Sequence, residues 1–122
     1  MYGFLVDVKD PQMTRVVEIE DSLETYYNLL NCDCIDIVVR TIGRKEFDIV
    51  CDDEGLFKQF PRVSAVDKDC KPMLVGNLLF LHHNEEGEMT GLSEDDVEHL
   101  IKHLVTVGDE RGVYHAVREV AY

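Results

Sequence analysis

Short runs of apolar and β-branched residues, separated by turn-forming residues, predict a sheet over much of the chain. Five runs have this pattern: residues 2–8 (YGFLVDV), 14–20 (TRVVEIE), 34–42 (CIDIVVRTI), 46–51 (EFDIVC) and 73–83 (MLVGNLLFLHH). Residues 10–11 (Asp-Pro) and 43–45 (GRK) are typical turns between neighbouring runs. The run at 73–83 is the most apolar, so we expect it at the centre of the sheet, with Gly76 marking a bulge or a close backbone approach.

A helical periodicity of apolar residues predicts a first helix over residues 21–31 (DSLETYYNLLN). Asp21 followed by Glu24 forms an acidic version of the capping box, and carboxylates are favourable at the positive end of a helix. The apolar face consists of Leu23, Tyr26, Tyr27 and Leu30.

A second helix is predicted over residues 92–104 (LSEDDVEHLIKHL), with Ser93 as N-cap and Asp96 three residues later. Its apolar face consists of Val97, Leu100, Ile101 and Leu104. The C-terminal segment 112–122 (GVYHAVREVAY) allows a third helix, because its valines recur at roughly helical spacing.

Together these elements predict an α+β fold. Strands and helices do not alternate, which favours a mostly antiparallel sheet, here of about five to six strands with two or three helices. The chain has 122 residues, 45% of them hydrophobic, which is enough to bury one core. We therefore expect a single domain over 1–122, with residues 109–122 as a C-terminal extension if the third helix forms.

Acidic residues exceed basic ones in both halves of the chain, and the formal net charge is −13. A surface this negative repels phosphate backbones and anionic lipid, so we expect no direct binding to nucleic acid or membranes. The N-terminus lacks the features of a signal peptide, and no apolar stretch is long enough to cross a bilayer. We therefore expect a cytoplasmic protein whose cysteines are thiols.

Two acidic segments end in glycine: residues 52–55 (DDEG) and 84–87 (NEEG). A calcium loop of the EF-hand type places Gly at its sixth position and Glu at its twelfth. Counting back from Gly55 puts Val50 at the first position and Pro61 at the twelfth, so this motif is absent. Both segments are instead typical of hairpin turns in which glycine takes a positive φ.

The cysteines do not form a recognisable reactive or metal site. A thiolate needs positive surroundings, whereas Cys51 adjoins two aspartates, and Cys32 and Cys34 follow the negative end of a helix. The Cys-x-Cys spacing is unusual for zinc, and Cys70 adds no second close pair.

The histidines are also a weak metal site. His99 and His103 lie four residues apart on the second helix but away from its apolar face, so we expect them to be solvated. His82 and His83 face opposite sides of a strand, so at most one of them can join the helical pair. For the basic cluster of Arg40, Arg44 and Lys45 we expect a solvated turn that closes against neighbouring acids, and a contact with an anion or a partner is the alternative. We predict no catalytic residue, no metal and no cofactor.

The densest charge lies between Glu85 and Glu98, where no Lys or Arg occurs. Seven acids form this segment: Glu85, Glu86, Glu88, Glu94, Asp95, Asp96 and Glu98. If the hairpin turn and the helix start lie close together, they form a negative patch that attracts a basic protein surface. Helix capping is an alternative explanation for the acids at the helix start.

Four segments carry a resemblance to a known family: VVEIEDSLETYYNLL, FDIVCDDEGLFKQFP, VGNLLFLHH and GLSEDDVEHL, which cover most of residues 15–100. In them the chain resembles a small uncharacterised domain family of phages, plasmids and Gram-positive bacteria. The family's proline-asparagine-arginine element corresponds here to FPRV, with Arg62 directly after Pro61 and the asparagine missing. The resemblance implies an α+β fold and a mobile-element setting, and it transfers no catalytic residue.

Three functions fit these observations. The leading one is a small acidic interaction protein that binds a host or defence protein with a basic surface through the acidic segment. The second is a small-molecule binder or unusual enzyme with a pocket beside the sheet, near Arg62, Gly76 and Asn77. The third is an accessory domain or a homo-oligomer joined through sheet edges.

Overall fold

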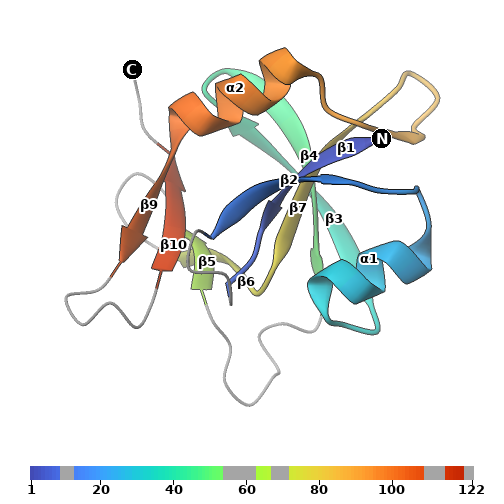
Figure 1. Cartoon of the computed structure of the whole chain (residues 1–122), viewed down its shortest axis with the longest axis horizontal. Helices are drawn as coiled ribbons and strands as arrows, with labels where there is room; N and C mark the ends of the chain where they lie inside the picture. Colours follow the sequence, from blue (N-terminus) through green and yellow to red (C-terminus); the bar gives the residue numbers. More distant parts are fainter. Residues whose placement is uncertain (9–12, 54–62, 67–71, 109–114, 120–122) are drawn as a thin grey trace.

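The computed structural model describes residues 1–8, 13–53, 63–66, 72–108 and 115–119 (Figure 1). Its elements in chain order are β1 (Tyr2–Val6), β2 (Thr14–Glu18), α1 (Leu23–Leu30), β3 (Ile35–Ile42), β4 (Lys45–Asp52), β5 (Val63–Val66), β6 (Pro72–Val75), β7 (Leu78–His83), β8 (Met89–Thr90), α2 (Glu94–His103), β9 (Leu104–Gly108) and β10 (His115–Glu119). The antiparallel sheet and the two helices confirm the predicted α+β fold. Neither of the described helices has the length and apolar character needed to cross a membrane.

The larger sheet has the strand order β2-β1-β7-β4-β3, with every neighbouring pair antiparallel, and β8 pairs with β7 outside this path. β7 lies at the centre, as its apolar sequence predicts. The predicted hairpin of β3 and β4 forms, and its turn residues Gly43 and Arg44 have φ values of 57° and 69°. Positive φ at both positions is typical of a type I′ turn, whose twist matches that of the paired strands.

The smaller sheet has the order β6-β5-β10-β9 and corrects two predictions. Residues 73–83 do not form one strand, because β6 and β7 belong to different sheets and the chain turns at Gly76, where φ is 73°. A Cβ added at Gly76 would meet no described atom within 4 Å, so this glycine supplies a backbone conformation and not a close approach. The third helix is also wrong: its residues 115–119 form β10, whose backbone pairs with β5 and β9.

The helix starts are fixed by side-chain caps. For α2 the predicted capping box forms between Ser93 and Asp96. For α1 the N-cap is Ser22 and not Asp21, because the Ser22 side chain accepts from the backbone N–H of Thr25. Asp21 instead accepts a hydrogen bond from the Tyr26 hydroxyl at 2.5 Å.

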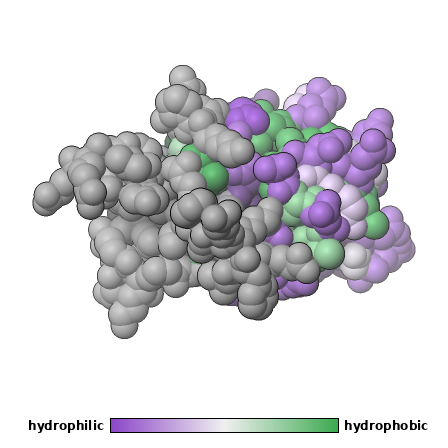
Figure 2. Space-filling view, turned by 90° about the horizontal axis from the view of Figure 1, so that it is seen from below, coloured by the Kyte–Doolittle hydropathy of each residue, from purple (hydrophilic) through white to green (hydrophobic). Residues whose placement is uncertain are grey.

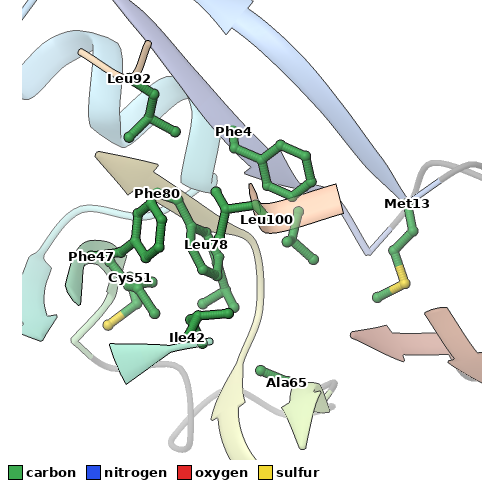
Figure 3. Packing of buried hydrophobic residues seen from close by; sticks show 12 residues of the cluster. Phe4, Met13, Ile42, Phe47, Cys51, Ala65, Leu78, Phe80, Leu92 and Leu100 are labelled. Atoms are coloured by element: carbon green, nitrogen blue, oxygen red, sulfur yellow. The ribbon is translucent and has the colours of Figure 1, made fainter. Parts of the chain in front are cut away.

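Alternate residues of β7 face two different cores. Leu79 lies in one core with Leu30 of α1. Phe80 lies in the other core with Leu100 of α2 (Figure 3). The rings of Phe80 and Phe4 meet edge to face, with centroids 6.0 Å apart. A strand buried on both faces is apolar at nearly every position, which explains why the sequence of β7 identifies it as central.

Large apolar side chains remain exposed at both ends of the larger sheet. Tyr2 and Val16, on β1 and β2, are 53% and 47% exposed, and Ile37 and Val39, on β3, are 43% and 47% exposed. Figure 2 shows small hydrophobic areas among hydrophilic residues on the described part of one face. The two ends of the sheet therefore offer separate surfaces for contact with other molecules.

Candidate functional site

The structure divides the predicted acidic segment into two exposed groups and one buried carboxylate. The first group, at the turn between β7 and β8, is Glu85, Glu86 and Glu88. The second group, on the first two turns of α2, is Glu94, Asp95 and Glu98. Asp96 is buried, so it does not contribute an exposed charge to a partner.

The NEEG turn forms as predicted. The Oδ1 atom of Asn84 accepts hydrogen bonds from the backbone N–H groups of Glu86, at 3.0 Å, and Glu88, at 2.9 Å. Gly87 has a φ of 83°, a conformation that favours glycine. Of the DDEG turn, only Asp52 and Asp53 lie within the described residues.

A groove with a volume of about 410 Å³ lies beside the acids of α2. Its lining comes from β1, β2, the segment before α2 and the helix itself: Tyr2, Val16, Leu92, Ser93, Glu94, Val97 and Glu98. We call this feature the acidic-rimmed groove, because its walls are mainly apolar and two of its lining residues carry carboxylates. Long basic side chains fit such a surface, since they combine an aliphatic stem with a terminal cation.

The segment before α2 is held close to β1, which creates one wall of the groove. The backbone N–H of Leu92 donates to the carbonyl oxygen of Tyr2 at 2.7 Å. A Cβ added at Gly91 would lie 2.7 Å from Met1 Cβ and 2.8 Å from the Tyr2 nitrogen. Glycine at position 91 is therefore required for this close approach.

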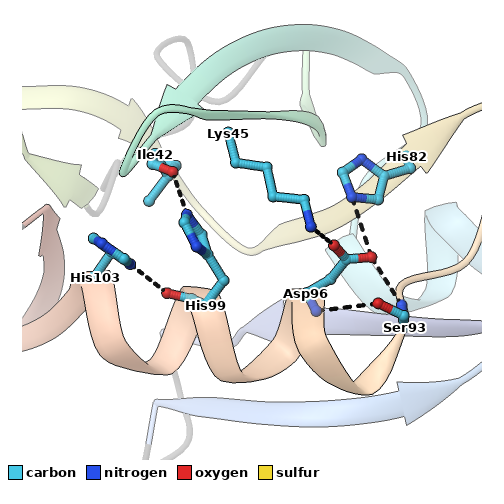
Figure 4. A network of polar contacts seen from close by, with 7 residues as sticks. All are labelled: Ile42, Lys45, His82, Ser93, Asp96, His99 and His103. Carbon is cyan, nitrogen blue, oxygen red and sulfur yellow. Dashed lines mark hydrogen bonds and ion pairs between the residues drawn. The ribbon is translucent and has the colours of Figure 1, made fainter.

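Asp96 anchors the start of α2 to the sheet (Figure 4). Its carboxylate accepts from the Ser93 backbone N–H at 2.9 Å, forms an ion pair with Lys45 of β4, and lies 3.2 Å from His82 Nε2. Burial by itself raises the pKa of the Asp96 carboxyl. The hydrogen bonds from Lys45, Ser93 and His82 outweigh burial and hold this pKa well below its ordinary value. Lys45, whose side chain is 41% exposed, therefore pairs with an acid as expected for this turn, and the acid is the buried Asp96.

The prediction that the two helical histidines are solvated is wrong. His99 Nε2 lies 2.6 Å from the carbonyl oxygen of Ile42, and His103 stacks on His99 with ring centroids 4.1 Å apart. The turn at Gly43 lies against the His103 ring, since a Cβ added there would be 2.4 Å from His103 Cδ2. The β3–β4 turn therefore covers a helix face that the helical wheel alone assigns to solvent.

His82 and His83 lie on opposite faces of the sheet, as predicted. His82 stacks on Phe47, with centroids 4.9 Å apart, and His83 Nδ1 lies 2.6 Å from Asp48 Oδ2 on the other face. In the described part of the chain, no group of three or more His, Cys, Asp or Glu side chains is arranged to hold a metal ion.

The surroundings of Cys51 oppose thiolate formation, as its neighbours predict. Burial, together with the charges of Asp36, Asp52 and Asp53, raises the pKa of this thiol to about 11, although Arg40 acts in the opposite direction. Cys70 lies outside the described residues.

The residues predicted for a small-molecule pocket do not converge in the described structure. Asn77 is bound to backbone at both ends of its amide: Oδ1 accepts from Val8 N–H at 3.0 Å, and Nδ2 donates to the Leu29 carbonyl at 2.9 Å. Gly76 forms the adjoining turn, and Arg62 lies outside the described residues. The amide of Asn77 therefore holds α1 and the end of β1 to β7.

Sequence reasoning missed the apolar part of the groove. Tyr2 and Val16 lie far from the acidic segment in sequence, and each fits an ordinary strand. The available signal was Gly91, two residues before the N-cap Ser93, because glycine permits close backbone contact. Which strand it would contact depends on the sheet order, which the sequence does not specify.

Comparison with known proteins identifies a family. Residues 1–105 match the model of a domain of unknown function, DUF3846, so the chain belongs to this family. Searches of curated proteins and of solved structures found no match.

Proposed function

We propose that this member of the DUF3846 family binds a basic segment of another protein in the acidic-rimmed groove. The observation that carries this proposal is the presence of Glu94 and Glu98 at an apolar groove of about 410 Å³. In the proposed complex, an apolar or aliphatic portion of the partner occupies the groove, and its Lys or Arg side chains meet the two carboxylates. The setting we propose is the cytoplasm of a cell that carries the phage or mobile element, with a host or defence protein as the partner.

Helix capping does not account for both carboxylates. The capping box uses Ser93 and Asp96, and the helix dipole favours an acid at Glu94 in the first turn. Glu98 lies in the second turn, where this effect has decreased. The helix dipole therefore accounts for Glu94 and not for Glu98, which lines the groove where a cationic side chain of the partner would bind.

The overall charge supports the same proposal. A net charge of −13 attracts a basic partner over a distance and accelerates encounter, while the groove supplies short-range contact. Both contributions are needed for specificity, because charge alone attracts any cationic surface.

The test uses two charge-matched double variants. E94Q/E98Q removes two carboxylates at the groove, and E85Q/E86Q removes two at the β7–β8 turn, so the net charge changes equally. Fluorescence anisotropy measures binding of a labelled peptide that alternates lysine and leucine, with a peptide of glutamate and leucine as the control. We expect E94Q/E98Q to weaken binding of the basic peptide about tenfold, and E85Q/E86Q to weaken it less than about threefold.

The salt dependence provides a second measurement. Raising the ionic strength from about 0.02 M to about 0.3 M shortens the screening length and should weaken binding steeply in the unaltered chain. Equal losses in the two double variants would show that binding follows net charge and does not use the groove. Tight binding that salt does not alter would remove electrostatics from the explanation.

A further inference from the structure

A different surface, at the opposite end of the larger sheet, is formed by the edge strand β3. Among the described strands, β3 is hydrogen-bonded only to β4. Its side chains Ile37 and Val39 point to the same face and are 43% and 47% exposed. An edge strand with exposed apolar residues is available for pairing with another strand.

The hairpin register determines which backbone groups point outward. Ile42 pairs with Lys45 across a two-residue turn, so the even-numbered residues of β3 form the hydrogen-bonded pairs with β4. The N–H and C=O groups of the odd-numbered residues then point away from β4. Two contacts agree with this assignment: Ile37 N–H donates to Asp36 Oδ1 at 2.9 Å, and Arg40 Nη1 donates to the Val39 carbonyl at 2.8 Å.

We propose that two copies of the chain dimerise by antiparallel pairing of their β3 strands about a two-fold axis at Val38. In this register, Ile37 of one copy lies opposite Val39 of the other, and both belong to the odd-numbered set with outward backbone groups. The larger sheet then continues across the two chains. A two-fold axis makes each contact occur twice, as in most homodimers.

The charges of β3 favour this register. Asp36 of each copy lies opposite Arg40 of the other, so two ion pairs of opposite charge form across the interface. In the single chain, the Ile37 N–H binds the Asp36 side chain, and the Val39 carbonyl binds the Arg40 side chain. In the dimer, the Ile37 N–H of each copy binds the Val39 carbonyl of the other copy. Asp36 and Arg40 are then released to pair between copies.

Charge reversal tests the register directly. D36R and R40D each place like charges opposite one another, whereas D36R/R40D restores two opposite pairs. Residues four apart in a strand are about 13 Å apart, so these two side chains cannot rescue each other within one chain. Analytical ultracentrifugation at about 0.15 M salt, where the repulsion between acidic chains is largely screened, should give a dimer for the unaltered chain and the double variant. Each single variant should raise the dissociation constant about tenfold or more.

A matched pair of valines separates this proposal from the groove. V39K and V16K introduce the same charge at two edge-strand positions that are both 47% exposed. V39K should abolish the dimer and leave peptide binding intact. V16K should abolish peptide binding and leave the dimer intact. Circular dichroism establishes that each variant is folded. A chain that stays monomeric at every concentration, a double reversal that does not restore the dimer, or a dimer lost in V16K but not in V39K would overturn the proposal.

Discussion

The buried carboxylate of Asp96 gives the sharpest prediction about stability. Its side chain is 8% exposed and joins three elements: the helix start at Ser93, Lys45 on β4 and His82 on β7. In D96N the amide keeps the size of the side chain and one oxygen acceptor, but it loses the charge and presents an NH₂ group to a site lined by donors. The structure therefore predicts that the loss is electrostatic and not steric.

The magnitude follows from the lost contacts. A hydrogen bond to a charged group contributes about 1.5–3 kcal/mol, and the Ser93 contact can be retained by the amide oxygen. Lys45 is 41% exposed and regains hydration when its partner is removed. We expect D96N to lower the free energy of unfolding by about 2–3 kcal/mol.

Urea unfolding followed by circular dichroism measures this loss, since the chain contains no tryptophan. The control is D95N, which removes the same charge from an exposed neighbour in the same helical turn and should cost at most about 1 kcal/mol. Equal losses in D96N and D95N would refute the role assigned to the buried network.

The stability that Asp96 contributes depends on pH in a defined direction. The pKa of Asp96 in the folded chain lies below its ordinary value of 3.8, so the stability that its charge contributes is fully present above about pH 3.8. This contribution is lost as the pH falls below 3.8 toward the folded-state pKa. The difference in stability between the unaltered chain and D96N should therefore narrow in acid. A difference that stays constant from neutral pH to below pH 3 would contradict the explanation.

Three further predictions follow from burial and backbone geometry. L100A should lower the free energy of unfolding by about 2–5 kcal/mol because it opens a cavity in the core, whereas I101A, at a side chain that is 62% exposed, should change it by less than about 1 kcal/mol; similar values in urea unfolding would contradict this assignment of the helix face. G43A should cost about 1–2 kcal/mol or more, since φ is 57° and the new methyl group would overlap the histidine ring beneath the turn; an unchanged melting temperature would be inconsistent with that packing. Alkylation at neutral pH, followed by mass spectrometry, should modify Cys51 far more slowly than the exposed Cys34, because burial and nearby carboxylates raise the pKa of Cys51 to about 11; equal rates would count against the buried thiol.

Local sequence patterns determined much of the secondary structure. The central strand β7, the β3–β4 hairpin, the NEEG turn and the capping box of α2 depend on residues close together in the chain, so periodicity and turn chemistry predict them. The same reasoning failed for residues 115–119, because helical spacing of valines is a weak preference that pairing with strands on both sides overrides. It also placed Ile101 on the buried face of α2, although the helix buries Asp96 and Leu100 and leaves Ile101 exposed.

Identifying the candidate surfaces requires both the sequence and the tertiary structure. The sequence by itself determined that the chain is acidic, that its charge is dense between Glu85 and Glu98, and that β3 carries Asp36 and Arg40 around an apolar centre. Only the tertiary structure decided which carboxylates are exposed, which one is paired with a lysine 51 residues away, and which strands lie at the ends of the sheet. The physical reason is that composition and periodicity act along the chain, whereas burial, ion pairing and edge position depend on the order in which distant strands assemble.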